Sequence, residues 1–220
     1  MNRYKKKVVL LPKAAGLMLN TEPLPNPAMY KAGSRTWKAE PWDWAGVFGR
    51  SGPVEVEIGF GTGGFLLPYA RQQPEMNLLG IEITRKMAHL TANRAWLEKL
   101  ANLRLALGDA RYFLAYKAPP ASVAAVHVYF PDPWVKKRHL KRRVINLDMV
   151  RQVRQVLKPG GRLHFATDHA EYFSYFLGLM EKFPEFRLLH TQPPAIKSAY
   201  ETKWRADQRE IFSRTYQLEV

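Results

Sequence analysis

Short apolar runs alternate with longer amphipathic stretches from residue 54 onward. The apolar runs predict strands, and the stretches between them predict helices. Such alternation is typical of an α/β fold with a mostly parallel sheet and helices on both faces. The predicted strands are 54–58, 78–83, 103–107, 123–130 and 163–166, and the predicted helices are 65–71, 85–100, 147–157 and 172–182.

The two ends of the chain have a different pattern. Prolines recur before residue 30 and remove backbone donors, so residues 1 to about 35 are expected to be irregular and to lie over the surface. We therefore predict a basic, proline-rich N-terminal arm over residues 1–50 and one folded domain over 51–220. Residues 211–220 alternate apolar and polar positions, which predicts a late antiparallel strand.

One turn signal inside the domain is strong. Lys158-Pro159-Gly160-Gly161 follows the third predicted helix. Glycine after a helix and proline near its end both favour termination, so this tetrapeptide is predicted to stop the helix and turn the chain.

Composition narrows the function classes. The chain of 220 residues has 34 Lys and Arg against 19 Asp and Glu, a formal charge of +15, which favours a polyanionic partner such as a nucleic acid. The absence of cysteine excludes disulfides, zinc ribbons, iron–sulfur clusters and thiol nucleophiles. No apolar run is long enough for a membrane span, and Val8–Leu11 is too short for a signal-peptide core, so we expect a cytoplasmic protein.

A glycine-rich loop follows the first predicted strand of the domain. Gly59, Gly61 and Gly64 satisfy G-x-G-x-x-G, and Glu82 follows 18 residues after Gly64. These glycines permit a tight turn and let a ligand approach bare backbone. The pattern leaves a dinucleotide-binding oxidoreductase, using NAD, open as an alternative.

Carboxylates stand at the ends of three successive predicted strands and favour another cofactor. Glu57, Glu82 and Asp109 each stand at the end of a predicted strand, where ligands bind in such folds. One acid can meet an ammonium, one the ribose hydroxyls and one the adenine amino group. That set suits S-adenosylmethionine, which has a zwitterionic end and no pyrophosphate.

The fourth strand runs into an unusual loop. Pro131-Asp132-Pro133-Trp134 holds a carboxylate between two prolines, which stiffen the backbone. Six of the eight residues from Lys136 to Arg143 are Lys or Arg. A possible reaction centre and a phosphate-binding segment therefore lie side by side in the sequence.

These motifs together resemble those of the bacterial tRNA (guanine-N7)-methyltransferases. The resemblance extends from about residue 54 to residue 201, and the Pro-Asp-Pro-Trp loop followed by the basic run is its most specific part. The matching segments are 57–63, 80–82, 108–110, 130–134, 136–139, 141–143 and 166–168.

The resemblance implies a class I methyltransferase fold and methyl transfer from S-adenosylmethionine to the variable-loop guanine, position 46, of tRNA. It implies that Asp132 is the catalytic residue and also contacts the cofactor, and that Lys136 and Asp168 contact the target nucleotide. The predicted cofactor-binding residues are then Glu57, Gly59, Gly61, Glu82, Asp109 and Asp132, and the predicted RNA-binding residues are Arg138, His139, Lys141, Arg142 and Arg143.

A last family motif, Thr-Lys-Phe-Glu, aligns with residues 198–201. Ser198, Tyr200 and Glu201 keep the hydroxyl, the ring and the carboxylate and are predicted to bind the substrate, while Ala199 replaces the family's lysine. Lys197 or Lys203 is a candidate substitute.

The sequence leaves other functions open. A methyltransferase for another RNA base or for an exocyclic amino group fits the Asp132 loop loosely, and a non-enzymatic RNA-binding module fits the charge alone. His127 is predicted to be a packed core histidine. Trp37, Trp42 and Trp44 lie close together in the sequence and are predicted to form an apolar anchor for the arm. His164 and His169 lack a third ligand, so we predict no metal. The expected partner is tRNA, with the protein a monomer or homodimer.

Overall fold

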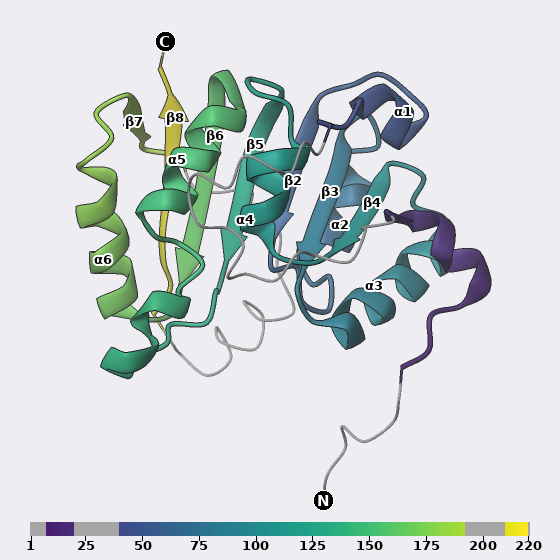
Figure 1. The fold of residues 1–220 in the computed structure, drawn as a ribbon, viewed down its shortest axis with the longest axis horizontal. Helices are drawn as coiled ribbons and strands as arrows, with labels where there is room; N and C mark the ends of the chain where they lie inside the picture. The colour runs from purple at the N-terminus through teal and green to yellow at the C-terminus, as the bar shows by residue number, and fades with distance from the viewer. Residues whose placement is uncertain (1–7, 20–39, 192–209, 220) are drawn as a thin grey trace, which may run out of the picture.

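A single mixed sheet organises the chain. In the computed structural model, which describes residues 8–19, 40–191 and 210–219, eight strands form this sheet in the order β1-β4-β3-β2-β5-β6-β8-β7 (Figure 1). All neighbouring pairs are parallel except those that involve β8. The strands are β1 (Met18–Leu19), β2 (Val54–Ile58), β3 (Asn77–Glu82), β4 (Leu103–Leu107), β5 (Val123–Tyr129), β6 (Leu157–Thr167), β7 (Phe186–Leu189) and β8 (Phe212–Leu218).

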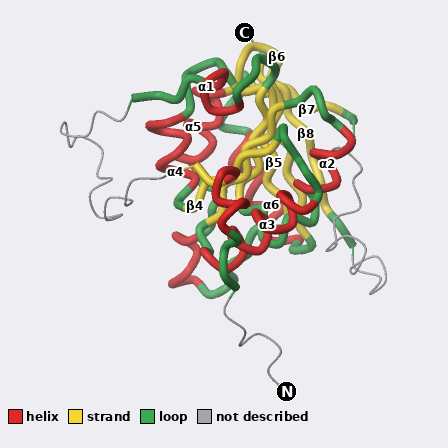
Figure 2. Tube along the Cα trace, turned by 90° about the vertical axis from the view of Figure 1, so that its right-hand side faces the viewer, coloured by secondary structure: helices red, strands yellow, loops and turns green. Residues whose placement is uncertain are grey.

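Helices cover both faces of the sheet, as the sequence predicted (Figure 2). Two buried apolar clusters lie on opposite faces, one against α1, α4, α5 and α6, the other against α2 and α3. The helices are α1 (Trp44–Phe48), α2 (Leu66–Gln72), α3 (Arg85–Leu97), α4 (Ala110–Tyr112), α5 (Leu147–Val156) and α6 (Ala170–Met180), with 3₁₀ helices η1 (Pro12–Leu17) and η4 (Lys137–Arg142) and a π-helix, η3 (Phe113–Lys117).

The late antiparallel strand is confirmed, and two strands were not predicted. β8 pairs antiparallel with β6, as expected, but β7 joins its outer side. At the opposite edge, β1 pairs with β4. Residues 12–19 are therefore not irregular, since η1 and β1 join them to the sheet; the domain division at residue 50 stays a prediction.

The tetrapeptide Lys158–Gly161 does not turn the chain back. The helix before it ends at Val156, and β6 runs from Leu157 through the tetrapeptide to Thr167. The pairing with β5 shifts register between Val123 and Ala125, so the extra residues form a bulge. Gly160 accommodates it with a φ of 75°, where glycine is favoured.

Aromatic packing joins α1 and the residues just before it to the rest of the domain. Trp42 and Trp44 contact each other, Trp42 contacts Phe113, and the Trp44 Nε1 donates to Ser122 Oγ at 2.9 Å. The prediction of an apolar anchor is confirmed for these two residues, while Trp37 lies outside the described residues.

Candidate functional site

The chain order of the sheet places a crevice between β2 and β5. From β2 the chain builds β3 and β4 on one side, then returns to form β5 on the other. Ligands in such sheets bind at this switch point, outside the carboxyl ends of the strands. A cavity of about 480 Å³ lies there, which is within the usual range for small-molecule sites. It is lined by Glu57, Gly59, Phe60, Gly61, Gly64, Phe65, Tyr129, Phe130, Pro131, Asp132, Pro133, Asp168 and His169.

The glycine loop forms one wall of the cavity. Gly59, Gly61 and Gly63 have φ values of 77°, 52° and 75°, a region that favours glycine. A Cβ built at Gly59 or Gly61 would meet nothing within 4 Å, so the loop presents open backbone there. A Cβ at Gly63 would lie 2.8 Å from Thr91 Cγ2, so this glycine serves close packing instead.

Glu57 is the buried acid of the site. Its side chain is 4% exposed, and its Oε2 atom has no hydrogen-bond partner among the described residues. Burial raises the pKa of Glu57 to about 8, with a further contribution from the charge of Glu82. A protonated carboxyl thus lies in the cavity wall at neutral pH, ready to become charged when a cation binds.

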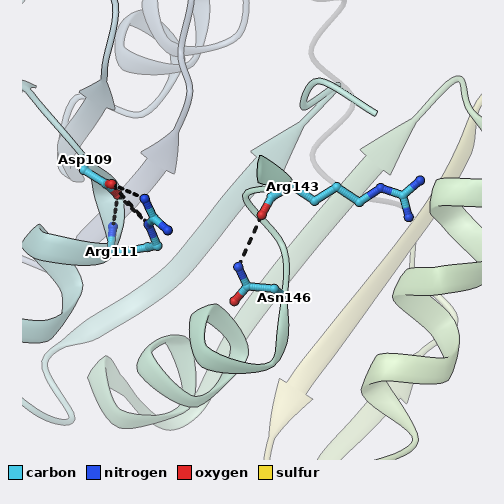
Figure 3. A network of polar contacts seen from close by, with 4 residues as sticks. All are labelled: Asp109, Arg111, Arg143 and Asn146. Atoms are coloured by element: carbon cyan, nitrogen blue, oxygen red, sulfur yellow. Dashed lines mark hydrogen bonds and ion pairs between the residues drawn. The ribbon is translucent and has the colours of Figure 1, made fainter. Parts of the chain in front are cut away.

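Glu82 and Asp109, the other two acids at the ends of the first three predicted strands, hold the backbone near the cavity and lie outside its lining. Glu82 Oε2 accepts from the Gly61 amide at 3.0 Å, and Oε1 accepts from the Thr84 amide at 2.7 Å. Asp109 caps α4 and accepts from the Arg111 guanidinium, with Nη2 at 2.5 Å from Oδ2 (Figure 3). Glu82 therefore shapes the glycine loop, and Asp109 is engaged by a neighbouring arginine.

Asp132 enters the cavity from a strained loop. Phe130 and Trp134, on either side of the Pro-Asp-Pro segment, have φ values of 49° and 44°. Bulky residues adopt this region only when their surroundings fix them. One constraint is the Phe130 amide, which donates to the Ala166 carbonyl oxygen of β6 at 2.8 Å. After β6, Asp168 lines the same cavity, so two carboxylates from separate strand ends meet there.

The basic segment continues directly from this loop. η4 has no buried residue, and Lys136 stands at its N-cap position. The guanidinium carbon of Arg142 lies 5.0 Å from the centroid of the Trp134 ring, and His139 meets the same ring edge-on at 5.6 Å. Arg138, His139, Lys141 and Arg142 are all at least partly exposed, but Arg143 is only 4% exposed.

A buried polar chain, which sequence reasoning missed, reaches the cavity wall. The Tyr129 hydroxyl lies 3.0 Å from His127 Nδ1, and His127 Nε2 lies 2.8 Å from Glu55 Oε2. Burial alone would raise the pKa of Glu55, but hydrogen bonding and the charge of His127 hold it below its usual value. The ionised Glu55 carboxylate can only accept, so His127 Nε2 carries the proton of this hydrogen bond. The Nδ1 atom faces the Tyr129 hydroxyl.

His127 is packed, as predicted, and it has a second histidine beside it. The ring of His164 stacks on His127 with centroids 4.8 Å apart, and His164 Nδ1 lies 2.9 Å from Thr215 Oγ1. Burial, helped by His127 and Arg162, lowers the pKa of His164 to about 2, so this ring is neutral. No local sequence pattern signals this chain, because Glu55 and His127 come from different strands.

Several predicted residues lie outside the described part of the chain. These include the substrate-binding candidates Ser198, Tyr200 and Glu201, and also Lys197, Ala199 and Lys203. Among residues 8–19, 40–191 and 210–219, no group of three His, Cys, Asp or Glu side chains is placed to hold a metal ion. In the same residues, no helix has the length and apolarity needed to cross a bilayer.

Comparison with known proteins identifies the family. A family model described as "Putative methyltransferase" matches residues 51–214. A curated tRNA (guanine-N(7)-)-methyltransferase of Rubrobacter xylanophilus is 33% identical over 172 residues, which cover 76% of this chain and 77% of the relative. The chain belongs to the tRNA (guanine-N(7)-)-methyltransferase family. The resemblance inferred from the motifs is thereby confirmed, and the NAD-dependent alternative gains no support.

Other family members are more similar over a shorter stretch. The protein of Syntrophotalea carbinolica is 43% identical over 134 residues, covering 61% of this chain and 58% of that relative. That of Vibrio parahaemolyticus is 40% identical over 151 residues, covering 68% of this chain and 63% of the relative. The chain thus spans about three fifths of the length of these curated family members.

Solved structures support the fold. The 30S ribosomal A1408 methyltransferase from an uncultured bacterium superposes with a TM-score of 0.57 at 15% identity, covering 79% of this chain and 91% of that one. A SAM-dependent methyltransferase from Aquifex aeolicus gives a TM-score of 0.54 at 14% identity, covering 76% and 83%. The predicted class I methyltransferase fold is confirmed.

Proposed function

We propose that this protein transfers a methyl group from S-adenosylmethionine to N7 of a guanine in tRNA, the variable-loop guanine at position 46. The observation that carries the proposal is the continuity between cavity and basic segment. Asp132 lines the cavity, and Trp134, two residues on, lies beneath Arg142 of η4. A carboxylate in a ligand cavity and a surface suited to phosphates therefore share one loop.

The cavity wall fits the proposed cofactor. Glu57 Oε2 is buried and has no partner among the described residues, which suits the ammonium of an amino-acid ligand. Gly59 and Gly61 leave the adjoining backbone open. Glu82 and Asp109, at the next two strand ends, are proposed for the ribose hydroxyls and the adenine amino group. When bound, S-adenosylmethionine supplies a methyl group activated by a sulfonium.

The chemistry needs alignment more than proton transfer. Guanine N7 carries a lone pair and no proton, so no strong base is required before attack. Asp132 would hold the base so that N7 takes up the methyl group as the bond from carbon to sulfur breaks, and its carboxylate would offset the positive charge that passes from sulfur to the base. Holding the reactants in line can account for roughly 7–11 kcal/mol of barrier lowering.

Asp132 is proposed as the residue that holds the target base. It is a hydrogen-bond acceptor, which guanine N1–H and N2–H can meet, and its charge offsets the positive charge that develops on the ring. The prolines beside it and the strained residues Phe130 and Trp134 fix its backbone. Asp168, which lines the same cavity, is proposed to hold the same nucleotide together with Lys136.

The exposed side of η4 is the proposed RNA surface. Arg138, His139, Lys141 and Arg142 present positive or protonatable groups on one short segment. Phosphates attract such groups with a strength that falls as salt rises. Ser198, Tyr200 and Glu201 remain proposed substrate contacts on the family resemblance.

The test is site-mapped methylation of a defined tRNA. Purified protein, S-adenosylmethionine and an unmodified tRNA transcript are mixed, and N7-methylguanosine is mapped by its chemical lability to chain cleavage. A transcript with adenine at position 46 is the matched control. We expect cleavage at the variable-loop guanine and none in the control.

Each other outcome removes a defined part of the proposal. Methyl transfer without a labile site rejects N7 as the acceptor and leaves the cofactor assignment standing. A labile site at another guanine rejects position 46. No methyl transfer with any tRNA transcript rejects the activity.

A further inference from the structure

Arg143 is buried, whereas its basic neighbours in the sequence are at least partly exposed. The side chain is 4% exposed, and its Nε donates to the Pro133 carbonyl oxygen at 2.8 Å. Its guanidinium carbon lies 4.6 Å from the Tyr172 ring centroid and 5.1 Å from that of Tyr175. A buried cation is retained only where hydrogen bonds and ring faces compensate for lost water.

The contacts of Arg143 join the Asp132 loop to α6. Pro133 belongs to the loop that carries Asp132, and both tyrosines belong to α6. The Nη2 atom also lies 3.6 Å from Glu171 Oε1 at the start of α6. The side chain extends away from its own backbone, whose carbonyl accepts from Asn146 (Figure 3). Arg143 thus links the Asp132 loop to a helix on the sheet face.

The Asp132 loop needs such a link. Phe130 and Trp134 both have positive φ, and residues in this region stay there only when other contacts fix them. β6 holds the loop at Phe130, through the amide that donates to Ala166. Arg143 holds it at Pro133, on the other side of Asp132.

We propose that Arg143 is a positioning residue for Asp132, and that it is not one of the phosphate contacts of the basic segment. This inference rests on the proposed methyl transfer. It assigns adjacent arginines opposite roles: the exposed Arg142 binds RNA phosphates, and the buried Arg143 fixes the loop. A phosphate contact must reach solvent, and Arg143 does not.

The Arg143→Lys variant separates the two roles. Lysine keeps the positive charge, so it would largely preserve a phosphate contact. It cannot donate from a planar guanidinium to the Pro133 carbonyl oxygen while lying over two tyrosine rings, so it would release the loop. The matched control is Arg151→Lys on α5, an exposed arginine paired with Asp148.

The measurements are the single-turnover methyl-transfer rate at saturating tRNA and the salt dependence of tRNA binding. For Arg143→Lys we expect the rate to fall about 10- to 100-fold, because small misplacements of reacting groups cost this much. We expect tRNA affinity within about twofold of wild type and an unchanged salt slope. Arg142→Ala should weaken tRNA binding and lower the salt slope by about one. Arg151→Lys should match wild type.

Two results would overturn the inference. One is a wild-type rate in Arg143→Lys; the other is a fall in tRNA affinity and salt slope in Arg143→Ala as large as that in Arg142→Ala. If thermal unfolding shows that the Arg143 variants do not fold, Tyr175→Leu decides, because it removes an exposed ring of the stack and keeps the charge. Its rate should fall in the same direction, and an unchanged rate rejects the proposal. If wild type methylates an atom other than N7, the proposed function fails, but the comparison of rates still tests Arg143.

Discussion

Replacing Glu57 with glutamine should stabilise the protein in a pH-dependent way. The folded protein keeps Glu57 protonated up to a pKa of about 8, while the unfolded chain ionises it near 4.5. Folding therefore takes up a proton between these values, and the contribution of Glu57 to stability, full below pH 4.5, is lost as the pH rises to about 8. Each pH unit above 4.5 lowers the free energy of unfolding by ~1.4 kcal/mol while the folded carboxyl stays protonated.

The magnitude follows from that slope. The cost is about 3 kcal/mol at pH 7 and about 1 kcal/mol at pH 5. Glutamine takes up no proton, so Glu57→Gln should raise the free energy of unfolding by about 3 kcal/mol at pH 7. The gain should shrink to about 1 kcal/mol at pH 5.

Urea denaturation of the ligand-free protein at the two pH values measures this difference. Asp148→Asn is the control, because its carboxylate is 78% exposed and the change should stay within about 0.5 kcal/mol. An equal difference in the free energy of unfolding between Glu57→Gln and wild type at pH 5 and pH 7 would refute a protonated Glu57 in the folded protein. Such a result would mean that Glu57 is already ionised in the folded protein.

Further predictions concern the same site and its surroundings. Binding of S-adenosylmethionine at pH 7 should release close to one proton from Glu57, measured by calorimetry in two buffers of different ionisation enthalpy; equal heats in both buffers would contradict this. Asp132→Asn should slow single-turnover methylation by roughly 10²-fold or more with little change in tRNA affinity, and an unchanged rate would remove its catalytic role. Gly63→Ala should lower the free energy of unfolding by about 1–3 kcal/mol, because its Cβ would lie 2.8 Å from Thr91 in a strained backbone; wild-type stability in urea would disprove the clash. His127→Ala should lower the free energy of unfolding by about 1–3 kcal/mol, because the buried Glu55 carboxylate loses its His127 partner and keeps only Tyr69; adding Glu55→Gln should recover part of that loss.

The sequence was sufficient to locate the cavity because strand ends in a parallel sheet share one edge. Glu57, Asp132 and Asp168 are far apart in the chain, yet each stands at or just after the end of a predicted strand, and the structure brings all three to one cavity. The tight turn of the glycine loop was equally predictable, because Gly59 and Gly61 adopt the positive φ that glycine favours. Sequence patterns were enough to predict a residue's place where the order of strands along the chain alone determined it.

Burial was much harder to predict. Arg142 and Arg143 are identical in type and adjacent, and only the packing of Tyr172 and Tyr175 on α6 separates their environments. Glu55 alternates with valines like a solvent-facing residue, but its strand is buried throughout, and its partner His127 comes from another strand. Contacts with residues distant in the sequence decide whether such side chains are buried.

Short elements and ambiguous turn signals account for the other differences. β1 has two residues and β7 has four, too few for a periodic pattern to stand out. Glycine with positive φ ends helices and also forms bulges, so Gly160 fits both a stop and the bulge that the structure contains.

The two-residue strand β1 has a consequence for solubility. Met18 pairs with Leu105 and Leu19 with Ala106, so β1 covers part of the outer edge of β4. Uncovered strand edges act as templates for edge-to-edge association between molecules. At the opposite edge, β7 is short and carries Arg187, whose ion pair with Glu219 puts charge there. A protein shortened past residue 19 would lose the first of these protections and should self-associate through β4.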